Sequence, residues 1–331
     1  MGYASEKKKV ENKAKIVKRI AFIVVAVLFL ALIIVSVIFP VHTWKYRIKL
    51  PKINARADKE MRIHFIDVGQ GDATIIELPD GKIMVIDGGN GSDDSVKALL
   101  RYITALKIEK VHYLLVTHAD LDHCGGLDEL IEYTAVERVF LPYVNPAVNG
   151  AYAKVYQAVT QSGCDLQYLS REISLTTENY CLQVLYPYAY DLEKNGEYLS
   201  GDNDSSAVVW LDYQGVSTLF TGDAPISVLK RLLMDNALGL LDMYGVKLSE
   251  TEILKLSHHG SQDGTDEEIL DSLGVQKAVI SCGKNNAYSH PSSQVYSMLT
   301  ARNLDIYRTD RDGSVMATVG ANGEYAFTTI F

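Results

Sequence analysis

The chain has 331 residues, of which 47% are hydrophobic and only 8 are Pro. This composition excludes a disordered, collagen-like or disulfide-scaffold protein. Charge is divided unevenly along the chain. Residues 1–62 carry 14 Lys/Arg and 4 Asp/Glu, a net charge of +10, whereas residues 63–331 carry 18 and 37, a net charge of −19. The sequence therefore predicts a basic, membrane-associated segment followed by a strongly acidic globular body.

The segment Ile20–Phe39 is almost entirely apolar, with Ser36 as its one polar residue. As a helix rising about 1.5 Å per residue, such a run spans roughly 30 Å, the thickness of a bilayer core. It ends without a small-residue cleavage site or a lipidation Cys, which favours an uncleaved anchor over a signal peptide.

The sequence predicts four segments: a basic cytoplasmic tail (1–19), a transmembrane helix (20–39), a basic and extended tether near the lipid headgroups (40–61), and an acidic globular domain (62–331). Lys and Arg residues before the apolar run favour a cytoplasmic N-terminus. We therefore expect a single-pass protein of the cell membrane, with its globular domain outside the cell.

Within the body, short apolar runs alternate with helical patterns, which is typical of α/β layers. The predicted strands include Ile63–Ile66, Thr74–Leu78, Ile83–Ile86, Tyr113–Val116 and Val216–Phe220, and predicted helices begin near Gly126 and at Pro225. No internal linker divides the body, which indicates one domain. The four cysteines show no CxxC spacing, so we interpret them as buried free thiols.

Four side chains of metal-ligand type follow the run Tyr113–Val116 within six residues: His118, Asp120, Asp122 and His123. His118 and Asp120 are two positions apart, so they project alike from an extended loop. Asp122 and His123 are then available to a second ion. This density of ligand-type residues favours a metal site over a solvated polar loop.

Two further polar motifs also follow apolar strands. Asp223 stands in TGD directly after Val216–Phe220, where a lone Asp is usually a helix cap. His258 and His259 stand in KLSHHGS. Adjacent histidines point in different directions, so we expect at most one of them to bind metal and the other to support it or to face the substrate.

The motifs HxDxDHxGG, TGD and HHGS, preceded by Asp87 in VIDGG, together resemble the metallo-β-lactamase superfamily. Within it, FIDVGQGDA (Phe65–Ala73), NDSS (Asn203–Ser206) and NNAYSHP (Asn285–Pro291) resemble the ComEC-type hydrolase domain of DNA-uptake proteins. The resemblance covers residues 63–331 in order, without the multi-spanning channel part. It implies an α/β fold, the four-layer αβ/βα sandwich, preceded here by one transmembrane helix.

The resemblance also implies two divalent ions that turn a shared water into the attacking hydroxide. The implied ligands are His118 and Asp120 for the first ion, Asp122, His123 and His258 for the second, and Asp223 as a bridge. Asp87 would support the loop, and Asp122 would also orient or deprotonate the water. Asp120 replaces a more usual His, and NDSS stands where another ligand His is common. These oxygen ligands make Mn²⁺ plausible beside Zn²⁺.

Other polar residues are candidates for contact with the substrate. Lys284 and His290 are candidates to contact a phosphate or to protonate the leaving group, although a surface Lys and a loop His before Pro are ordinary features. Asn203 and Ser205 are candidate hydrogen-bond donors, and His259 is expected to face the substrate.

The leading hypothesis is a membrane-anchored, metal-dependent phosphodiesterase or nuclease of ComEC type. The net charge of −19 in residues 63–331 opposes a polyanionic substrate, because proteins that bind nucleic acid usually carry a basic surface. The alternative is a hydrolase of a small or cell-envelope substrate, such as a phosphoester, lactone or β-lactam. A catalytically silent binding module is disfavoured because every ComEC-type metal position is present. No stable protein partner is expected.

Overall fold

The computed structural model describes residues 2–38, 40–189 and 198–331. Met1, the first residue of the predicted tail, and Phe39, the last residue of the predicted transmembrane helix, lie outside the described residues. The chain divides into two compact units, residues 1–48 and residues 49–331. The first unit holds one long helix, and the second holds two β-sheets with their covering helices.

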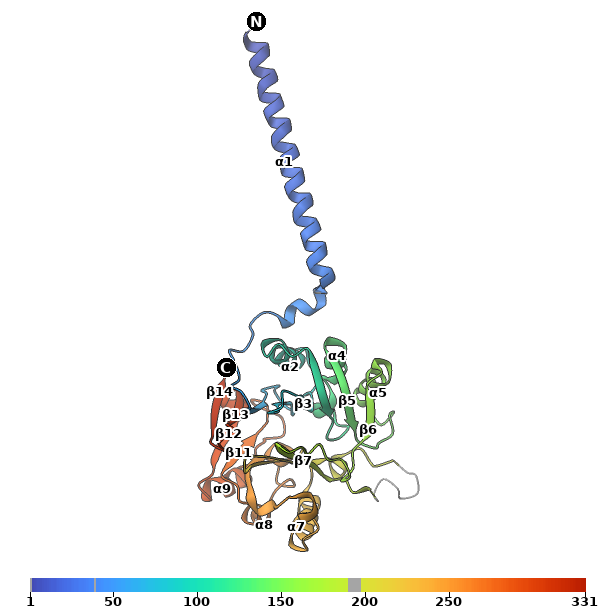
Figure 1. Cartoon of the computed structure of the whole chain (residues 1–331), viewed down its shortest axis with the longest axis vertical. Helices are drawn as coiled ribbons and strands as arrows, with labels where there is room; N and C mark the ends of the chain where they lie inside the picture. Colours follow the sequence, from blue (N-terminus) through green and yellow to red (C-terminus); the bar gives the residue numbers. More distant parts are fainter. Residues whose placement is uncertain (1, 39, 190–197) are drawn as a thin grey trace. The chain divides into compact units, whose positions relative to one another are not determined.

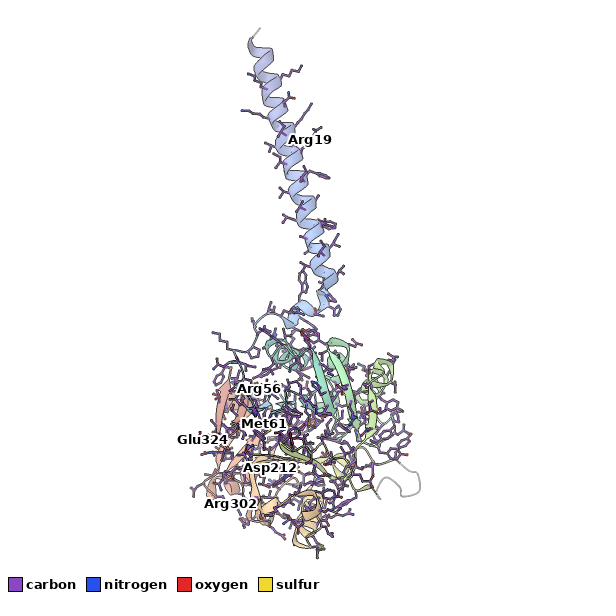
Figure 2. All side chains as sticks on the ribbon, viewed as in Figure 1. Arg19, Arg56, Met61, Asp212, Arg302 and Glu324 are labelled. Atoms are coloured by element: carbon purple, nitrogen blue, oxygen red, sulfur yellow. The ribbon has the colours of Figure 1, made fainter. Side chains whose placement is uncertain are left out.

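The N-terminal unit consists of helix α1 (Gly2–Ile38) and a short 3₁₀ helix, η1 (Val41–Tyr46). Within α1, Asn12–Val37 is long and apolar enough to cross a membrane, and its most apolar window is not buried in protein. Figure 2 shows its side chains projecting on every side of the helix. The predicted tether is not extended throughout, because η1 occupies its first part.

The C-terminal unit is built around two sheets. Among the described residues, eight strands form the larger sheet in the order β14-β13-β1-β2-β3-β4-β5-β6, and six form the smaller one in the order β12-β11-β10-β9-β8-β7. The larger sheet contains β1 (Met61–Phe65), β2 (Thr74–Glu77), β3 (Ile83–Ile86), β4 (Lys110–Leu115), β5 (Ala135–Leu141), β6 (Asp165–Tyr168), β13 (Ser314–Val319) and β14 (Tyr325–Ile330). The smaller sheet contains β7 (Tyr180–Tyr186), β8 (Val208–Tyr213), β9 (Val216–Phe220), β10 (Thr251–Lys255), β11 (Lys277–Ile280) and β12 (Asp305–Arg308).

Helices cover the outer face of each sheet (Figure 1). The helices are α2 (Asp93–Ala105), α3 (Leu121–Cys124), α4 (Leu127–Tyr133), α5 (Gly150–Ser162), α7 (Ile226–Ala237), α8 (Glu267–Ser272), α9 (Ser293–Ala301) and α10 (Thr309–Asp312). In Figure 1, α2, α4 and α5 lie beside the larger sheet, and α7, α8 and α9 lie on the opposite side of the unit. The result is the predicted four-layer αβ/βα sandwich.

Two apolar cores hold these layers together. One lies between the sheets and contains strand residues of both, such as Phe65 and Phe220, whose rings are 6.2 Å apart. The other lies beneath α7, α8 and α9 and includes Leu232, Ile269 and Val295. Every residue of β1 and β9 is buried, including the polar side chains of Arg62 and His64 in β1 and of Ser217 and Thr218 in β9.

Part of the predicted tether is bound to the domain. The buried guanidinium of Arg62 donates to the carbonyl oxygens of Asn54 (2.7 Å) and Ala55 (3.0 Å), and Arg56 donates to the carbonyl of Leu78. The compact unit therefore begins at residue 49 and includes a stretch that the sequence assigned to the tether.

Candidate metal centre

The polar motifs meet because their strands end at neighbouring edges. β3, β4 and β5 are parallel to one another, and so are β9, β10 and β11. Parallel strands bring the loops that follow them to one edge of a sheet. The loops after β4, β9 and β10, together with the β1–β2 loop, bring together a buried set whose ligand atoms lie within 4.8 Å of one another: Asp72, His123, Asp223 and His259.

His123 is oriented by Asp87. Its Nδ1 lies 2.8 Å from Oδ2 of Asp87, which also accepts from Thr117 Oγ1 (2.7 Å). The other carboxylate oxygen of Asp87 accepts from the Thr117 backbone N–H at 2.8 Å. The Nδ1 proton of His123 is therefore held by Asp87, and Nε2 faces Asp223 Oδ1 at 3.1 Å. Asp87 supports this loop, as the resemblance implied.

His259 is oriented in the same way by a backbone carbonyl. Its Nδ1 donates to the carbonyl oxygen of Ser281 at 2.9 Å. Its Nε2 lies 3.2 Å from Asp122 Oδ2 and 3.5 Å from Asp223 Oδ2. A hydrogen bond at one ring nitrogen leaves the other free to bind metal, which is the usual arrangement around metal-ligating histidines.

Asp72 lies behind these rings, on their Nδ1 side. Its oxygens are 3.4 Å from Nδ1 of His259 and 3.9 Å from Nδ1 of His123, and it forms a 2.6 Å ion pair with the buried ammonium of Lys255. Burial alone would raise the pKa of Asp72, but Lys255 and His259 lower it below its usual range. Asp72 is therefore a charged support for the two rings.

The Nε2 side of the cluster fits a cation. Buried acceptor atoms face one another there, and Nε2 of His118, His123 and His259 and Oδ1 of Asp223 have no hydrogen-bond partner among the described residues. Burial opposes charge on the rings, yet Asp223 and Asp87 raise the pKa of His123 well above its usual value. Asp223, Asp122 and Asp72 likewise raise the pKa of His259 to about 10 against the effect of burial. Such a surplus of buried negative charge is balanced by protons or by metal ions.

His118 and Asp120 form a second, smaller group beside this cluster. The His118 ring is buried, with its centroid 4.1 Å from that of His123, and its Nε2 lies 3.7 Å from Asp120 Oδ2. Nδ1 of His118 lies 3.1 Å from Thr117 Oγ1, so Nε2 is again the nitrogen available to a metal. The side chain of Asp120 is 48% exposed.

His258, predicted as a metal ligand, and His259, predicted to face the substrate, lie at different depths in the site. The side chain of His259 is 2% exposed and lies in the cluster, whereas that of His258 is 24% exposed at its rim. Nδ1 of His258 is 3.1 Å from Asp263, and its Nε2 is 3.8 Å from Asp223. Both residues have positive φ, so a tight turn directs the second ring inward, which the spacing of adjacent histidines does not reveal.

The remaining predicted residues differ in their positions. Nδ2 of Asn203 lies 3.3 Å from the His258 ring. Ser205 is buried, and its hydroxyl donates to the carbonyl of Asp202, so the structure does not bring it to the site. Lys284 is exposed and does not line the cavity described below, whereas His290 does.

A cavity of about 140 Å³ opens above the cluster. Eight residues line it: Gln70, Asp120, Asp122, Asp223, His258, His259, Tyr288 and His290. All except Gln70 and Tyr288 are predicted site residues. Sequence reasoning missed Gln70 and Tyr288, together with Asp72 and Lys255. The signal for Gln70 and Asp72 was the glycine pair that flanks Gln70 in VGQGD. Gly71 allows this loop to pass close to the loop after β4, because a Cβ at Gly71 would lie 2.3 Å from the Asp122 carbonyl oxygen.

Comparison with known families agrees with this geometry. The model of the metallo-beta-lactamase superfamily matches residues 66–284. The chain belongs to this superfamily. Its members share the sandwich fold, and membership supports the assignment of this chain as a hydrolase. The fold generally binds divalent metals, and the buried His/Asp cluster fits such a site.

Curated relatives narrow the type to the ComEC-like hydrolase domain. ComE operon protein 3 of Bacillus subtilis (strain 168) is 30% identical over 274 residues, covering 77% of this chain and 33% of that protein. Recombination protein 2 of Haemophilus influenzae is 26% identical, covering 77% and 28%. Competence protein ComA of Neisseria gonorrhoeae is 23% identical, covering 80% and 33%. The chain thus spans about a third of the length of these relatives.

Proposed function

We propose that this chain is a membrane-anchored, metal-dependent phosphodiesterase of ComEC type that cleaves single-stranded DNA or a related phosphodiester. The observation that carries the proposal is the Nε2 side of the cluster, where Asp122 and Asp223 face His123 and His259. Mixed carboxylate and imidazole ligands suit Mn²⁺ or Zn²⁺, and hard oxygen ligands favour phosphoryl chemistry. The competence protein among the relatives supports a DNA substrate.

Two groups of side chains would each hold one metal ion. Asp122, His123, Asp223 and His259 would hold one ion, and His118 and Asp120, with Asp223, would hold the other. Bound ions would acidify a water and neutralise charge on the phosphate oxygens.

Each remaining step belongs to side chains of this chain. Asp122 lines the cavity and is the base that accepts the proton of the attacking water. Asp87 and the Ser281 carbonyl keep the two imidazole rings directed at the reaction. Burial, together with His258 and His259, lowers the pKa of His290, so its neutral ring can donate a hydrogen bond to a substrate oxygen.

The test is hydrolysis of single-stranded DNA by the full chain in detergent, with Mn²⁺, with Zn²⁺ or with a chelator. We expect metal-dependent cleavage, and we expect Asp122→Asn to reduce the rate at least about 100-fold because it removes the base and weakens a metal ligand. A folded, metal-loaded protein that leaves DNA intact would exclude this substrate.

One observation favours a second candidate function. Residues 63–331 carry a net charge of −19, and two divalent ions would offset about four of those charges. A small or cell-envelope phosphoester meets less repulsion than a polyanion. Hydrolysis of a small phosphodiester without cleavage of DNA would favour this candidate.

We also propose that α1 is the anchor and that the catalytic domain lies outside the cell. The support is the span Asn12–Val37 and the Lys and Arg residues at positions 7–19, which precede its uninterrupted apolar part. Protease added to intact cells should digest the domain, and protection until the cells are lysed would reverse the orientation.

A further inference from the structure

Three aromatic rings run from the metal cluster to the protein surface. The rings of His259 and His290 are stacked with centroids 6.2 Å apart, and those of His290 and Tyr288 are stacked at 5.6 Å. Their interplanar angles are 29° and 25°. All three line the cavity, yet Tyr288 is 66% exposed. The outermost ring therefore offers a flat aromatic surface at the mouth of the site.

The loop that carries the rings of Tyr288 and His290 is braced by one side chain, that of Asn286. Nδ2 of Asn286 donates to the carbonyl oxygens of Gly283 (2.9 Å) and His290 (2.6 Å). Oδ1 of Asn286 accepts from the backbone N–H groups of Tyr288 (3.2 Å) and His290 (2.9 Å). The loop that carries the exposed ring of Tyr288 is thus held in place, which lowers the entropic cost of binding a ligand on it.

The same loop is tied to the turn that carries His259. The backbone N–H of Ser292 donates to the carbonyl of Gly260 at 2.9 Å. A Cβ at Gly260 would lie 2.6 Å from Cβ of Pro291, so only a glycine allows this close approach. The aromatic surface and the metal cluster therefore form one unit.

The charge of the site limits how a substrate can be held beyond its phosphate. Asp120, Asp122 and Asp223 line the same cavity, and Lys284, the lysine of the braced loop, does not line it. Affinity for the rest of the substrate must then come from uncharged contacts. Stacking on an aromatic ring is such a contact, and every nucleobase has a face suited to it.

We infer that Tyr288, supported by His290, is a nucleobase-stacking site that binds the base of a nucleotide whose phosphate lies at the metal cluster. This inference rests on the proposed function and narrows its substrate to phosphodiesters that carry a base. It also gives a strongly acidic domain a source of affinity for a nucleotide that does not depend on basic side chains.

The experiment compares two substrates with the same leaving group, the 4-nitrophenyl ester of thymidine 5′-phosphate and methyl 4-nitrophenyl phosphate. The full chain in detergent with Mn²⁺ is compared with Tyr288→Ala, Tyr288→Phe and Tyr198→Ala, an exposed tyrosine outside the cavity lining. We expect Tyr288→Ala to lower kcat/KM about 10-fold or more for the thymidine ester, mainly through KM, and to leave the methyl ester unchanged. Tyr288→Phe and Tyr198→Ala should behave like the parent.

Equal losses on both substrates, or no loss on the thymidine ester, would overturn the inference. If the parent hydrolyses neither ester, hydrolysis of single-stranded DNA decides the proposed function, and binding decides the inference. Thermal shift with thymidine 5′-phosphate should then exceed that with inorganic phosphate or glucose 1-phosphate, and Tyr288→Ala should abolish the difference. Equal shifts for the three ligands, or an unchanged difference in the variant, would contradict a base-stacking site.

Discussion

At the scale of single residues, the site depends on which nitrogen of each imidazole is free. Asp87 and the Ser281 carbonyl hold the Nδ1 protons of His123 and His259, so both Nε2 atoms face Asp223. The sequence shows two adjacent histidines after β10 but not which one turns inward. The positive φ of both residues decides this, and such a turn leaves no clear pattern in sequence.

The two adjacent histidines should therefore respond differently to substitution. His259→Ala removes a ring from the buried cluster, so we expect loss of bound metal and a fall in activity of at least about 100-fold. His258→Ala removes a ring at the rim, and we expect metal content to be retained and activity to fall by less than about 10-fold. Metal analysis of the purified variants and hydrolysis of a small phosphodiester check both outcomes. The reverse order would return the ligand role to His258.

The ion pair of Asp72 and Lys255 gives a second prediction at this scale. Both side chains are almost fully buried, so Asp72→Asn leaves the Lys255 ammonium without its partner. Removing one partner of a buried pair typically costs about 3–5 kcal/mol of stability. The double variant Asp72→Asn, Lys255→Met should recover much of that loss because neither charge of this pair remains. Urea unfolding with a chelator present measures all three proteins, and additive losses would show that the two groups are independent.

At the scale of helices and strands, α4 carries an unusual carboxyl group. Burial and the neighbouring carboxyl of Asp128 raise the pKa of Glu129 to about 7, and its Oε2 has no hydrogen-bond partner among the described residues. A carboxyl group with a raised pKa binds its proton more tightly in the folded state. Its stabilising contribution is complete below about pH 4.5 and is lost as the pH rises to about 7.

Glu129→Gln should therefore stabilise the protein at pH 8 and change it little at pH 4.5, because glutamine stays neutral at both. Urea-unfolding midpoints at the two pH values test this. The control is Glu132→Gln, an exposed position on the same helix, for which we expect no such gain at pH 8. Equal effects of Glu129→Gln at both pH values would mean that Glu129 does not titrate in this range.

The sequence predicted elements well where most residues of a strand are buried and are apolar or β-branched. β3 and β9 have the predicted bounds, and α7 begins directly after Pro225 as expected. It missed β5, whose first half alternates exposed and half-buried residues around Glu137 and Arg138. In the site, ligand-type residues clustered after strands could be recognised. Asp72 could not, because its role arises from a contact with Lys255, 183 positions away in the chain, that only the packing of the two sheets creates.

At the scale of the whole molecule, charge and predicted substrate act against each other. A domain with a net charge of −19 repels a polyanion at a distance, although bound cations attract one phosphate locally. Stacking on Tyr288 would contribute affinity that does not depend on charge. The balance of these two effects can be read from the dependence of the reaction on salt.

Proteins that bind nucleic acid through basic surfaces lose affinity as salt increases, because binding releases counterions from the phosphates. Here we expect the opposite for DNA. Raising the ionic strength from about 0.01 M to about 0.15 M shortens the screening length from about 30 Å to about 8 Å, which weakens the long-range repulsion but affects contacts in the site much less. At DNA concentrations below KM the cleavage rate should therefore rise several-fold, and the rate on the singly charged thymidine ester should stay nearly constant. A rate on DNA that falls steeply with salt would instead reveal a local basic groove that guides the strand to the cluster.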